Sequence, residues 1–344
     1  MYSLYKIIKA WLPLLKLGNT VSRRNELEKY SEYLVLSSLE KANIFNYLKK
    51  PRTLNDLTRE FSWEYPSKYV DDLLKILVND KILIQNNDHY LFNEGIVIEK
   101  PDVKFIEDFN DVFETYALGI PDRLKGKYFD YTGRLALFNW DSVLAGSIYQ
   151  ALRDSALNFV DIKNNNGFQL LDVGCGPGYE TTDLWLRFQN DKSKIVAIDY
   201  DTDLLKIAQE EFCQNIAKKG FKETTWDKLE NPPSFLETSA ENMDIFQDNS
   251  FDVVYFSNFL HWLEEPLVGI KEMYRVLKPG GIIFGSQGTT EVTNPYLDIT
   301  ARVVKGTNGY FSKKQFAEWF KEAGFVKLKS ATMVNTFKAR KPMN

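Results

Sequence analysis

The sequence of 344 residues has few cysteines, few histidines and no long apolar run. Two cysteines, Cys175 and Cys213, cannot build a disulfide framework, and they fit a reducing, cytoplasmic compartment. Two histidines, His89 and His261, cannot supply a histidine-rich metal site, and no carboxylate spacing demands a metal, so we expect none. Because no stretch approaches about 18 apolar residues, we expect no transmembrane helix.

The sequence also lacks a strong excess of charge. Its formal net charge is −4 and its pI is near 5.5, so no field over the whole chain would hold a nucleic acid. What it does contain is 44% hydrophobic and 26% charged residues, which is typical of a globular protein. Its length allows two domains, each with its own core.

Residues 1–30 form an N-terminal segment that begins with an amphipathic stretch. Within residues 1–18, aromatic and aliphatic side chains such as Trp11 and Leu15 recur at near-helical spacing, with lysines between them. Lysines and Pro13 interrupt the apolar run, which argues against a signal peptide. A basic amphipathic helix can lie on a membrane surface, so peripheral membrane contact is one hypothesis. Packing on a partner subunit or on a second domain is the favoured alternative.

Residues 31–98 show the pattern of a winged helix. Helical spacing at 31–49, an N-cap at Thr53 and an amphipathic run after residue 65 predict three helices, and two short strands follow. The third helix of such a fold would enter the DNA major groove, but here it carries Asp71 and Asp72, which would face phosphates. We therefore expect no nucleic-acid partner, and a homodimer formed through this domain.

Residues 99–160 form a connector that is rich in aromatic residues. Those between Phe105 and Tyr149 are candidates for a lid over a substrate, although plain packing explains them equally. A helix is expected from Asp141 through Phe159, with its apolar side chains on one face.

Residues 161–344 alternate between strand and helix, which predicts an α/β domain with a doubly wound parallel sheet. Ligands in such sheets bind at the carboxyl ends of the strands. The expected strands are Phe168–Val173, Lys194–Asp199, Phe235–Thr238, Phe251–Ser257, Gly281–Ser286, Val326–Lys329 and Ala331–Phe337. The expected helices are Thr181–Phe188, Thr202–Lys219, Pro266–Leu277 and Ser312–Ala323.

A glycine-rich loop follows the first of these strands. The run Leu170-Leu-Asp-Val-Gly-Cys-Gly-Pro-Gly has the spacing G-x-G-x-G, which departs from the G-x-G-x-x-G of a pyrophosphate site. Asp172 stands two residues before the first glycine, and a carboxylate there favours a cofactor with a cationic tail. Asp199 ends the next strand, 27 positions later, where a carboxylate can accept hydrogen bonds from ribose hydroxyls.

These residues carry a resemblance to the class I (Rossmann-like) S-adenosylmethionine-dependent methyltransferases. The glycine loop, the Ala-Ile-Asp strand end, the run Asp248–Val254 and the Leu-Lys-Pro-Gly-Gly at 277–281 match the family in order. The resemblance implies a seven-stranded Rossmann-like sheet and S-adenosylmethionine as the cofactor, with S-adenosylhomocysteine as its product. Ser239 stands where the family often has an acid. The cofactor-binding residues that we expect are Asp172, Gly174, Cys175, Gly176, Gly178, Asp199, Tyr200, Ala240, Glu241 and Ser257.

The order of domains is similar to that of small-molecule O-methyltransferases of the caffeic-acid type, which have a winged-helix dimerisation domain. In that group a His-Asp-Trp carries the catalytic base, and this chain has His261-Trp at the corresponding point. His261 is thus a candidate catalytic base, with a pocket-wall role as the alternative. We expect O-methylation of a small aromatic or apolar metabolite. The alternatives are a lipid or quinone acceptor at a membrane, a domain that binds cofactor without turnover, and a winged-helix regulator that senses the cofactor.

Overall fold

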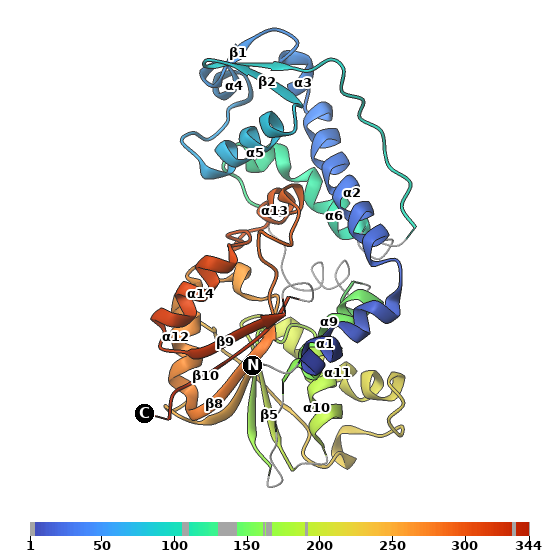
Figure 1. The fold of residues 1–344 in the computed structure, drawn as a ribbon, viewed down its shortest axis with the longest axis vertical. Helices are drawn as coiled ribbons and strands as arrows, with labels where there is room; N and C mark the ends of the chain where they lie inside the picture. The colour runs from blue at the N-terminus through green and yellow to red at the C-terminus, as the bar shows by residue number, and fades with distance from the viewer. Residues whose placement is uncertain are drawn as a thin grey trace. The chain divides into compact units, whose positions relative to one another are not determined.

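The computed structural model describes residues 4–104, 110–129, 143–160, 162, 167–189, 192–331 and 335–343. The chain divides into two compact units, which Figure 1 draws as a ribbon. The first unit combines Met1–Gly18, Thr132–Val292 and Tyr310–Asn344, and the second combines Asn19–Tyr131 and Thr293–Gly309. These boundaries differ from the consecutive domains expected from the sequence, because the segment 293–309 leaves the first unit and joins the second.

The first unit is built on one sheet of seven strands. The strands are β4 (Gln169–Val173), β5 (Lys194–Asp199), β6 (Ser234–Glu237), β7 (Phe251–Ser257), β8 (Leu277–Ser286), β9 (Val326–Ala331) and β10 (Thr336–Arg340). Their order is β6-β5-β4-β7-β8-β10-β9, and β10 runs antiparallel to both of its neighbours. The strands from β4 to β8 pair with one another in parallel. This confirms the predicted doubly wound, seven-stranded sheet, and its order reverses between β4 and β7, where ligands of such sheets bind.

Helices cover both faces of this sheet, as Figure 1 shows. Successive residues of a strand point to opposite faces, so Leu170 packs with α9 (Ser147–Phe159), α10 (Tyr179–Phe188) and α11 (Thr202–Lys218), whereas Leu171 packs with α12 (Pro266–Val276) and α14 (Lys313–Glu322). Both leucines are fully buried. The near-continuous apolar run of the strand is therefore the consequence of burial on both sides.

The N-terminal segment forms the helix α1 (Leu4–Leu17), which packs on α9 within the first unit. Ala10 is fully buried against Phe159, and Asn158 Nδ2 donates a hydrogen bond to the carbonyl of Lys9 at 3.4 Å. The opposite face leaves Leu15 60% exposed. The expected amphipathic helix is therefore present, while membrane contact through it stays a prediction. Within the part of the chain that is described, no helix is long and apolar enough to cross a membrane.

The second unit is mostly helical. Its helices are α2 (Thr20–Lys41), α3 (Ile44–Tyr47), α4 (Leu54–Phe61), α5 (Lys68–Asn79), α6 (Asn110–Leu118), α7 (Ile120–Arg123) and α13 (Pro295–Ala301). A small antiparallel sheet has the order β1 (Arg52–Thr53), β3 (His89–Phe92) and β2 (Leu83–Asn86). Thr53 caps α4 as expected, in a reciprocal capping box with Asp56. Helices and a β-hairpin thus occur in this region, while the winged-helix fold and dimerisation through this unit stay predictions.

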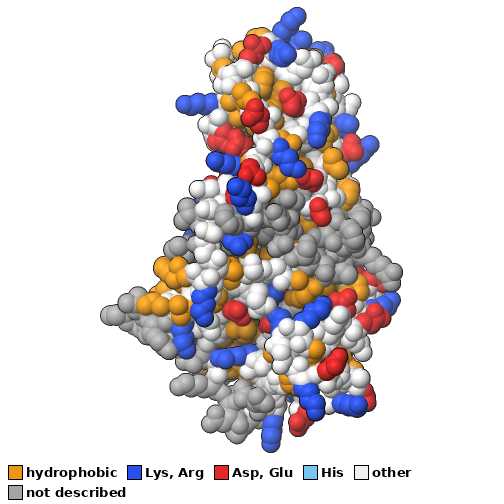
Figure 2. All heavy atoms as spheres, turned by 90° about the vertical axis from the view of Figure 1, so that its right-hand side faces the viewer, with side chains coloured by type: hydrophobic (Ala, Val, Ile, Leu, Met, Phe, Trp, Pro, Cys, Tyr) orange, Lys and Arg blue, Asp and Glu red, His pale blue; other side chains and the backbone are white. Residues whose placement is uncertain are grey.

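The segment 293–309 explains the environment of the third predicted helix, α5. Arg302 donates from Nη1 to Asp72 at 2.8 Å, and the Tyr69 hydroxyl donates to the carbonyl of Ile299 at 3.2 Å. The sequence analysis assumed that Asp72 would face phosphates. In the structure Asp72 is instead paired with Arg302 inside the unit. Basic and acidic side chains are mixed over the face drawn in Figure 2, in keeping with the small net charge.

The aromatic connector is described only in part. Phe113 and Tyr116 of α6 are buried in the second unit, where they serve packing. The predicted helix at Asp141 is described from Val143, and its regular part, α9, starts only at Ser147. Of the lid candidates, Phe105, Phe109, Tyr131, Phe138 and Trp140 lie outside the described residues.

Candidate cofactor and active site

The glycine loop leaves the carboxyl end of β4 and leads into α10. A side chain at Gly174 would meet the ring of Phe259 at 2.2 Å, and one at Gly178 would meet the Ala208 side chain at 2.9 Å, so both positions are closed by packing. Gly176 differs: its φ is +51° and no atom lies within 4 Å of the place where a Cβ would stand. The loop therefore presents bare backbone to open space at Gly176, which is what the close approach of a ligand requires.

Asp199 joins the end of β5 to this loop. Its Oδ2 accepts a hydrogen bond from the Gly176 amide at 2.9 Å, and its Oδ1 accepts from the Asp201 amide at 3.0 Å. Burial raises the pKa of this carboxyl, while the backbone hydrogen bonds oppose the rise. The Tyr200 amide also acts on this carboxylate, whose two oxygens together offer about four acceptor positions, so one position is left for a further donor. A hydrogen bond thus joins Gly176 and Asp199, which we predicted separately, and Tyr200, the next residue, is 66% exposed.

Asp172 lies in β4 below the loop, and it is 1% exposed. Its Oδ2 accepts a hydrogen bond from the Thr181 hydroxyl at 2.6 Å. Burial raises the pKa of this carboxyl to about 8, and the charges of Glu180 and Asp199 act in the same direction. A cation near Asp172 would therefore stabilise its ionised form.

The remaining predicted cofactor contacts are distributed around the loop. Ala240 is buried after β6, and the Glu241 carboxylate accepts a hydrogen bond from the Glu265 amide at 2.5 Å, which orients it toward the start of α12. Cys175 turns away from the open side and packs against Ala197 and Leu205. Burial raises the pKa of its thiol well above the usual value, so it is no nucleophile at neutral pH.

At the other side of the switch point, Ser257 ends β7 and Ser286 ends β8. Their hydroxyl oxygens lie 2.7 Å apart, which ties the two strand ends together. Beyond Ser257 a short 3-10 helix, η4 (Leu260–Trp262), carries His261. Its imidazole is 5% exposed and stacks on Tyr310 with ring centroids 4.8 Å apart. Burial lowers the pKa of His261 to about 3, so the ring is neutral at physiological pH.

Gln287, which follows β8, is a site residue that the sequence analysis missed. Its Oε1 accepts hydrogen bonds from the amides of Phe259 and Leu260 at 3.2 and 3.1 Å, so the side-chain nitrogen must face the other way. That nitrogen donates to the Gly288 carbonyl at 3.1 Å and faces His261 Nδ1 at 3.4 Å. An N–H that faces Nδ1 favours the tautomer of the neutral ring with its proton on Nε2. His261 is thereby arranged as a hydrogen-bond donor at Nε2.

No group of three or more potential metal ligands occurs among the described residues. The expectation that no metal takes part stays a prediction.

Comparisons with known proteins give the same class of fold. Residues 171–285 match the model of a family described as "Methyltransferase domain", which is less than half of the chain. Demethylmenaquinone methyltransferases of Staphylococcus aureus are similar over 170 residues, and that of strain MRSA252 is 27% identical. The match covers 48% of this chain and 64% of the relative, so the chain spans less than two thirds of the curated relatives' length.

Solved structures match over nearly the whole chain. The CurJ carbon methyltransferase superposes with a TM-score of 0.69 at 15% identity and covers 98% of both chains. The CMeT domain of the citrinin polyketide synthase gives a TM-score of 0.67 at 12% identity, over 100% of this chain and 99% of that one. At such identities the likeness shows the fold alone, and the likeness to winged-helix O-methyltransferases stays a prediction. Residues 171–285 therefore match a methyltransferase domain, and the chain as a whole has the Rossmann-like α/β fold of the solved carbon methyltransferases.

Proposed function

We propose that this protein is an S-adenosylmethionine-dependent methyltransferase. The observation that carries the proposal is the open backbone at Gly176, whose amide is held by the buried carboxylate of Asp199. The open space beside Gly176 is one that a Cβ would fill. It lies next to a carboxylate with an acceptor position left, and this fits a nucleoside whose ribose hydroxyls donate hydrogen bonds. When bound, S-adenosylmethionine supplies an electrophilic methyl group to a nucleophile.

Asp172 fits the other end of the same cofactor. Its carboxyl is buried, has one hydrogen-bond donor in Thr181 and has its pKa raised to about 8. The amino-acid part of S-adenosylmethionine carries an ammonium group, which would favour the ionised form of Asp172. We assign the methionine part to the Gly174–Gly178 loop and the ribose to Asp199. We place the adenine near Ala240, which is buried after β6, with Glu241 next to it in the chain.

The arrangement of His261 decides which acceptor we favour. A neutral imidazole with its proton on Nε2 donates a hydrogen bond and cannot take a proton at that atom. Such a donor stabilises negative charge that develops on an oxygen, as in the enolate of a carbon acid beside a carbonyl group. We therefore propose methylation at carbon, on an acceptor acidic enough to enolise without a protein base at Nε2. The CurJ and DszA structures, which share this fold, are carbon methyltransferases, and this supports the choice.

Of the two other acceptors expected from the sequence, the observations oppose one and favour the other. O-methylation, as expected from the sequence, requires His261 to take a proton, and the Gln287 amide opposes the tautomer that would do so at Nε2. A quinone acceptor is supported by the name of the demethylmenaquinone relatives and by the exposed apolar side chains of α1. The regulator hypothesis stays a prediction.

The test is a transfer assay with methyl-labelled S-adenosylmethionine and three acceptors. These are a 1,3-dicarbonyl thioester, a naphthoquinol and a catechol, with the position of the label determined by mass spectrometry and NMR. We expect carbon-bound label on the thioester, and none with Asp199→Ala. Label only on catechol oxygen would contradict carbon methylation. No transfer to any acceptor, together with no cofactor binding, would contradict the enzyme itself.

His261→Gln and His261→Ala separate donor from base in the same assay. The glutamine amide places an N–H near the position of Nε2, so a donor role predicts partial activity in His261→Gln and a further loss in His261→Ala. A base role predicts that both variants lose activity equally.

A further inference from the structure

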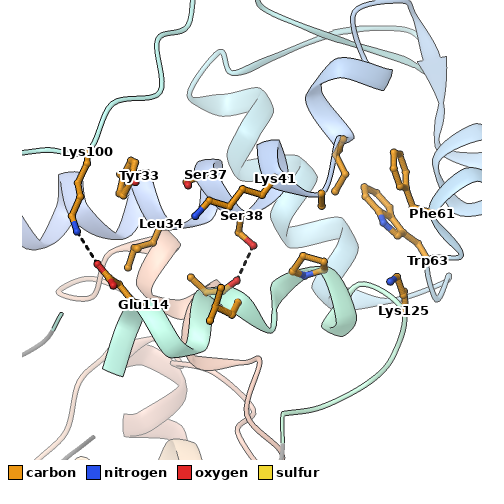
Figure 3. A pocket seen from close by; sticks show the side chains of 15 residues that line it. Tyr33, Leu34, Ser37, Ser38, Lys41, Phe61, Trp63, Lys100, Glu114 and Lys125 are labelled. Atoms are coloured by element: carbon orange, nitrogen blue, oxygen red, sulfur yellow. Dashed lines mark hydrogen bonds and ion pairs between the residues drawn. The ribbon is translucent and has the colours of Figure 1, made fainter. Parts of the chain in front are cut away.

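The second unit contains a cavity of about 600 Å³ that belongs to no part of the site described above. It lies between α2 on one side and α6 and α7 on the other, with the end of α4 closing one end, as Figure 3 shows. A volume of this size matches pockets that bury a small organic molecule. It is formed within one compact unit, so its shape depends only on contacts inside that unit.

The wall of the cavity is largely apolar. Leu34 and Ile44 line it from the α2 side, and Phe61 and Trp63 line the end near α4 with ring centroids 6.1 Å apart. Trp63 is 7% exposed, so its indole belongs to the wall and not to the outer surface. Such a wall suits an acyl chain or an aromatic body, which loses its contact with water there.

A serine hydroxyl lies in the wall of the cavity (Figure 3). Ser37 is 7% exposed, and no hydrogen bond of its hydroxyl is found among the described residues. Its neighbour Ser38 differs, because its hydroxyl donates to the carbonyl of Ala117 at 2.7 Å and so joins the two walls. The Ser37 hydroxyl can therefore donate a hydrogen bond to a ligand oxygen in the cavity.

The cation next to this hydroxyl is Lys41, one helical turn further along α2. In Figure 3 its side chain extends along the cavity beside Ser37 and Ser38. The two other lysines of the lining already have partners: Lys100 pairs with Glu114 at 2.9 Å and Lys125 with Asp122 at 3.4 Å. Lys41 forms no ion pair within 4 Å of a described carboxylate; the charge of Glu114, which Lys100 already pairs, acts on it from farther away, so its ammonium can contact an anion in the cavity.

We propose that this cavity binds a small amphipathic anion, with an acyl or aromatic body ending in a carboxylate or a phosphate. The anionic end lies between the Ser37 hydroxyl and the Lys41 ammonium, and the apolar body lies along Leu34 toward Phe61 and Trp63. This site is independent of the proposed methyl transfer, because its residues belong to the second unit and take no part in the glycine loop.

Calorimetric titration of the full-length protein with three ten-carbon probes tests the proposal. Decanoate and decyl phosphate carry the two candidate head groups, and decanol is the neutral control of equal chain length. We expect at least one anion to bind about tenfold more tightly than decanol, the ratio that 1.4 kcal/mol produces. Comparison of decanoate with decyl phosphate identifies the head group.

Variants locate the binding. Lys41→Met keeps the apolar stem and removes the charge, so it should weaken the anion about tenfold and leave decanol unchanged. Lys29→Met is the matched control, since Lys29 is an exposed lysine of the same helix outside the cavity. Ser37→Ala should also weaken the anion. The proposal is overturned if no anion binds the folded protein, if decanol binds equally well, or if Lys41→Met and Lys29→Met behave alike.

Discussion

Replacing Gly176 by alanine should have two separate effects: a small loss of folding stability from the strained backbone, and a loss of cofactor affinity from the filled space. Gly176 has φ +51°, and an alanine forced into this left-handed region costs about 1 kcal/mol. No atom lies within 4 Å of the added methyl, so no clash increases that cost. The methyl would, however, occupy the open space in which we place the cofactor. We therefore expect a small loss of stability and a loss of at least tenfold in affinity for S-adenosylhomocysteine.

Gly220 offers a matched control. It has φ +86°, likewise has no atom within 4 Å of an added Cβ, and lies after the end of α11, away from the glycine loop. Urea unfolding should show that Gly176→Ala and Gly220→Ala each lose about 1 kcal/mol in free energy of unfolding. Calorimetry should show normal affinity in Gly220→Ala only. If both variants bind S-adenosylhomocysteine like the parent, the loop is not the cradle.

Three further predictions concern buried groups. Burial raises the pKa of Asp172 to about 8 from an ordinary 3.8. Between pH 3.8 and pH 8 the carboxyl therefore holds a proton in the folded protein but not in the unfolded chain. The free energy of unfolding should then fall as the pH rises through that range. A bound ammonium favours the ionised form, so binding of S-adenosylhomocysteine near pH 6 should release a proton, detected by calorimetry in buffers of different ionisation heat; equal release by Asp172→Asn would contradict this. Arg153 is 2% exposed and pairs with two carboxylates at 2.7 and 3.7 Å, so Arg153→Met should lose about 3–5 kcal/mol in urea unfolding, against about 0–1 for the exposed, paired Arg24→Met. A similar loss in both variants would refute the buried pair. Finally, ¹⁵N NMR should find the His261 proton on Nε2, and Gln287→Glu should move it to Nδ1 and raise the pKa of the ring; a proton on Nδ1 in the parent would refute the assigned role.

The parts of the fold that follow from local sequence were predictable. Each strand of the parallel sheet is a short apolar run bounded by turn residues, and all five predicted parallel strands are present. The last hairpin was placed incorrectly, because the expected strand Ala331–Phe337 reads as one continuous run. The structure ends β9 at Ala331 and starts β10 at Thr336, after Asn335 with φ +53°. An asparagine supplies this positive φ where no glycine or proline marks the turn.

The parts that depend on distant contacts were not predictable. Nothing local indicates that Thr293–Gly309 belongs to the second unit, since its membership rests on pairs such as Arg302 with Asp72, 230 positions apart. The same holds in the site. Gly176 and Asp199 belong to short sequence motifs and could be predicted from them. Gln287 acts on His261 from 26 positions away, and only the packed sheet brings the two together.

The measurement that tests the central claim most directly is calorimetric titration with S-adenosylmethionine and S-adenosylhomocysteine on the intact protein, on Asp199→Ala and on Asp203→Ala. Asp203 is an exposed carboxylate at the start of α11, paired with Lys206, and serves as the control. We predict binding with a dissociation constant of about 1 µM to 1 mM in the parent and the control, and none in Asp199→Ala. Absence of binding to the intact, folded protein would contradict the account, and so would equal binding by Asp199→Ala.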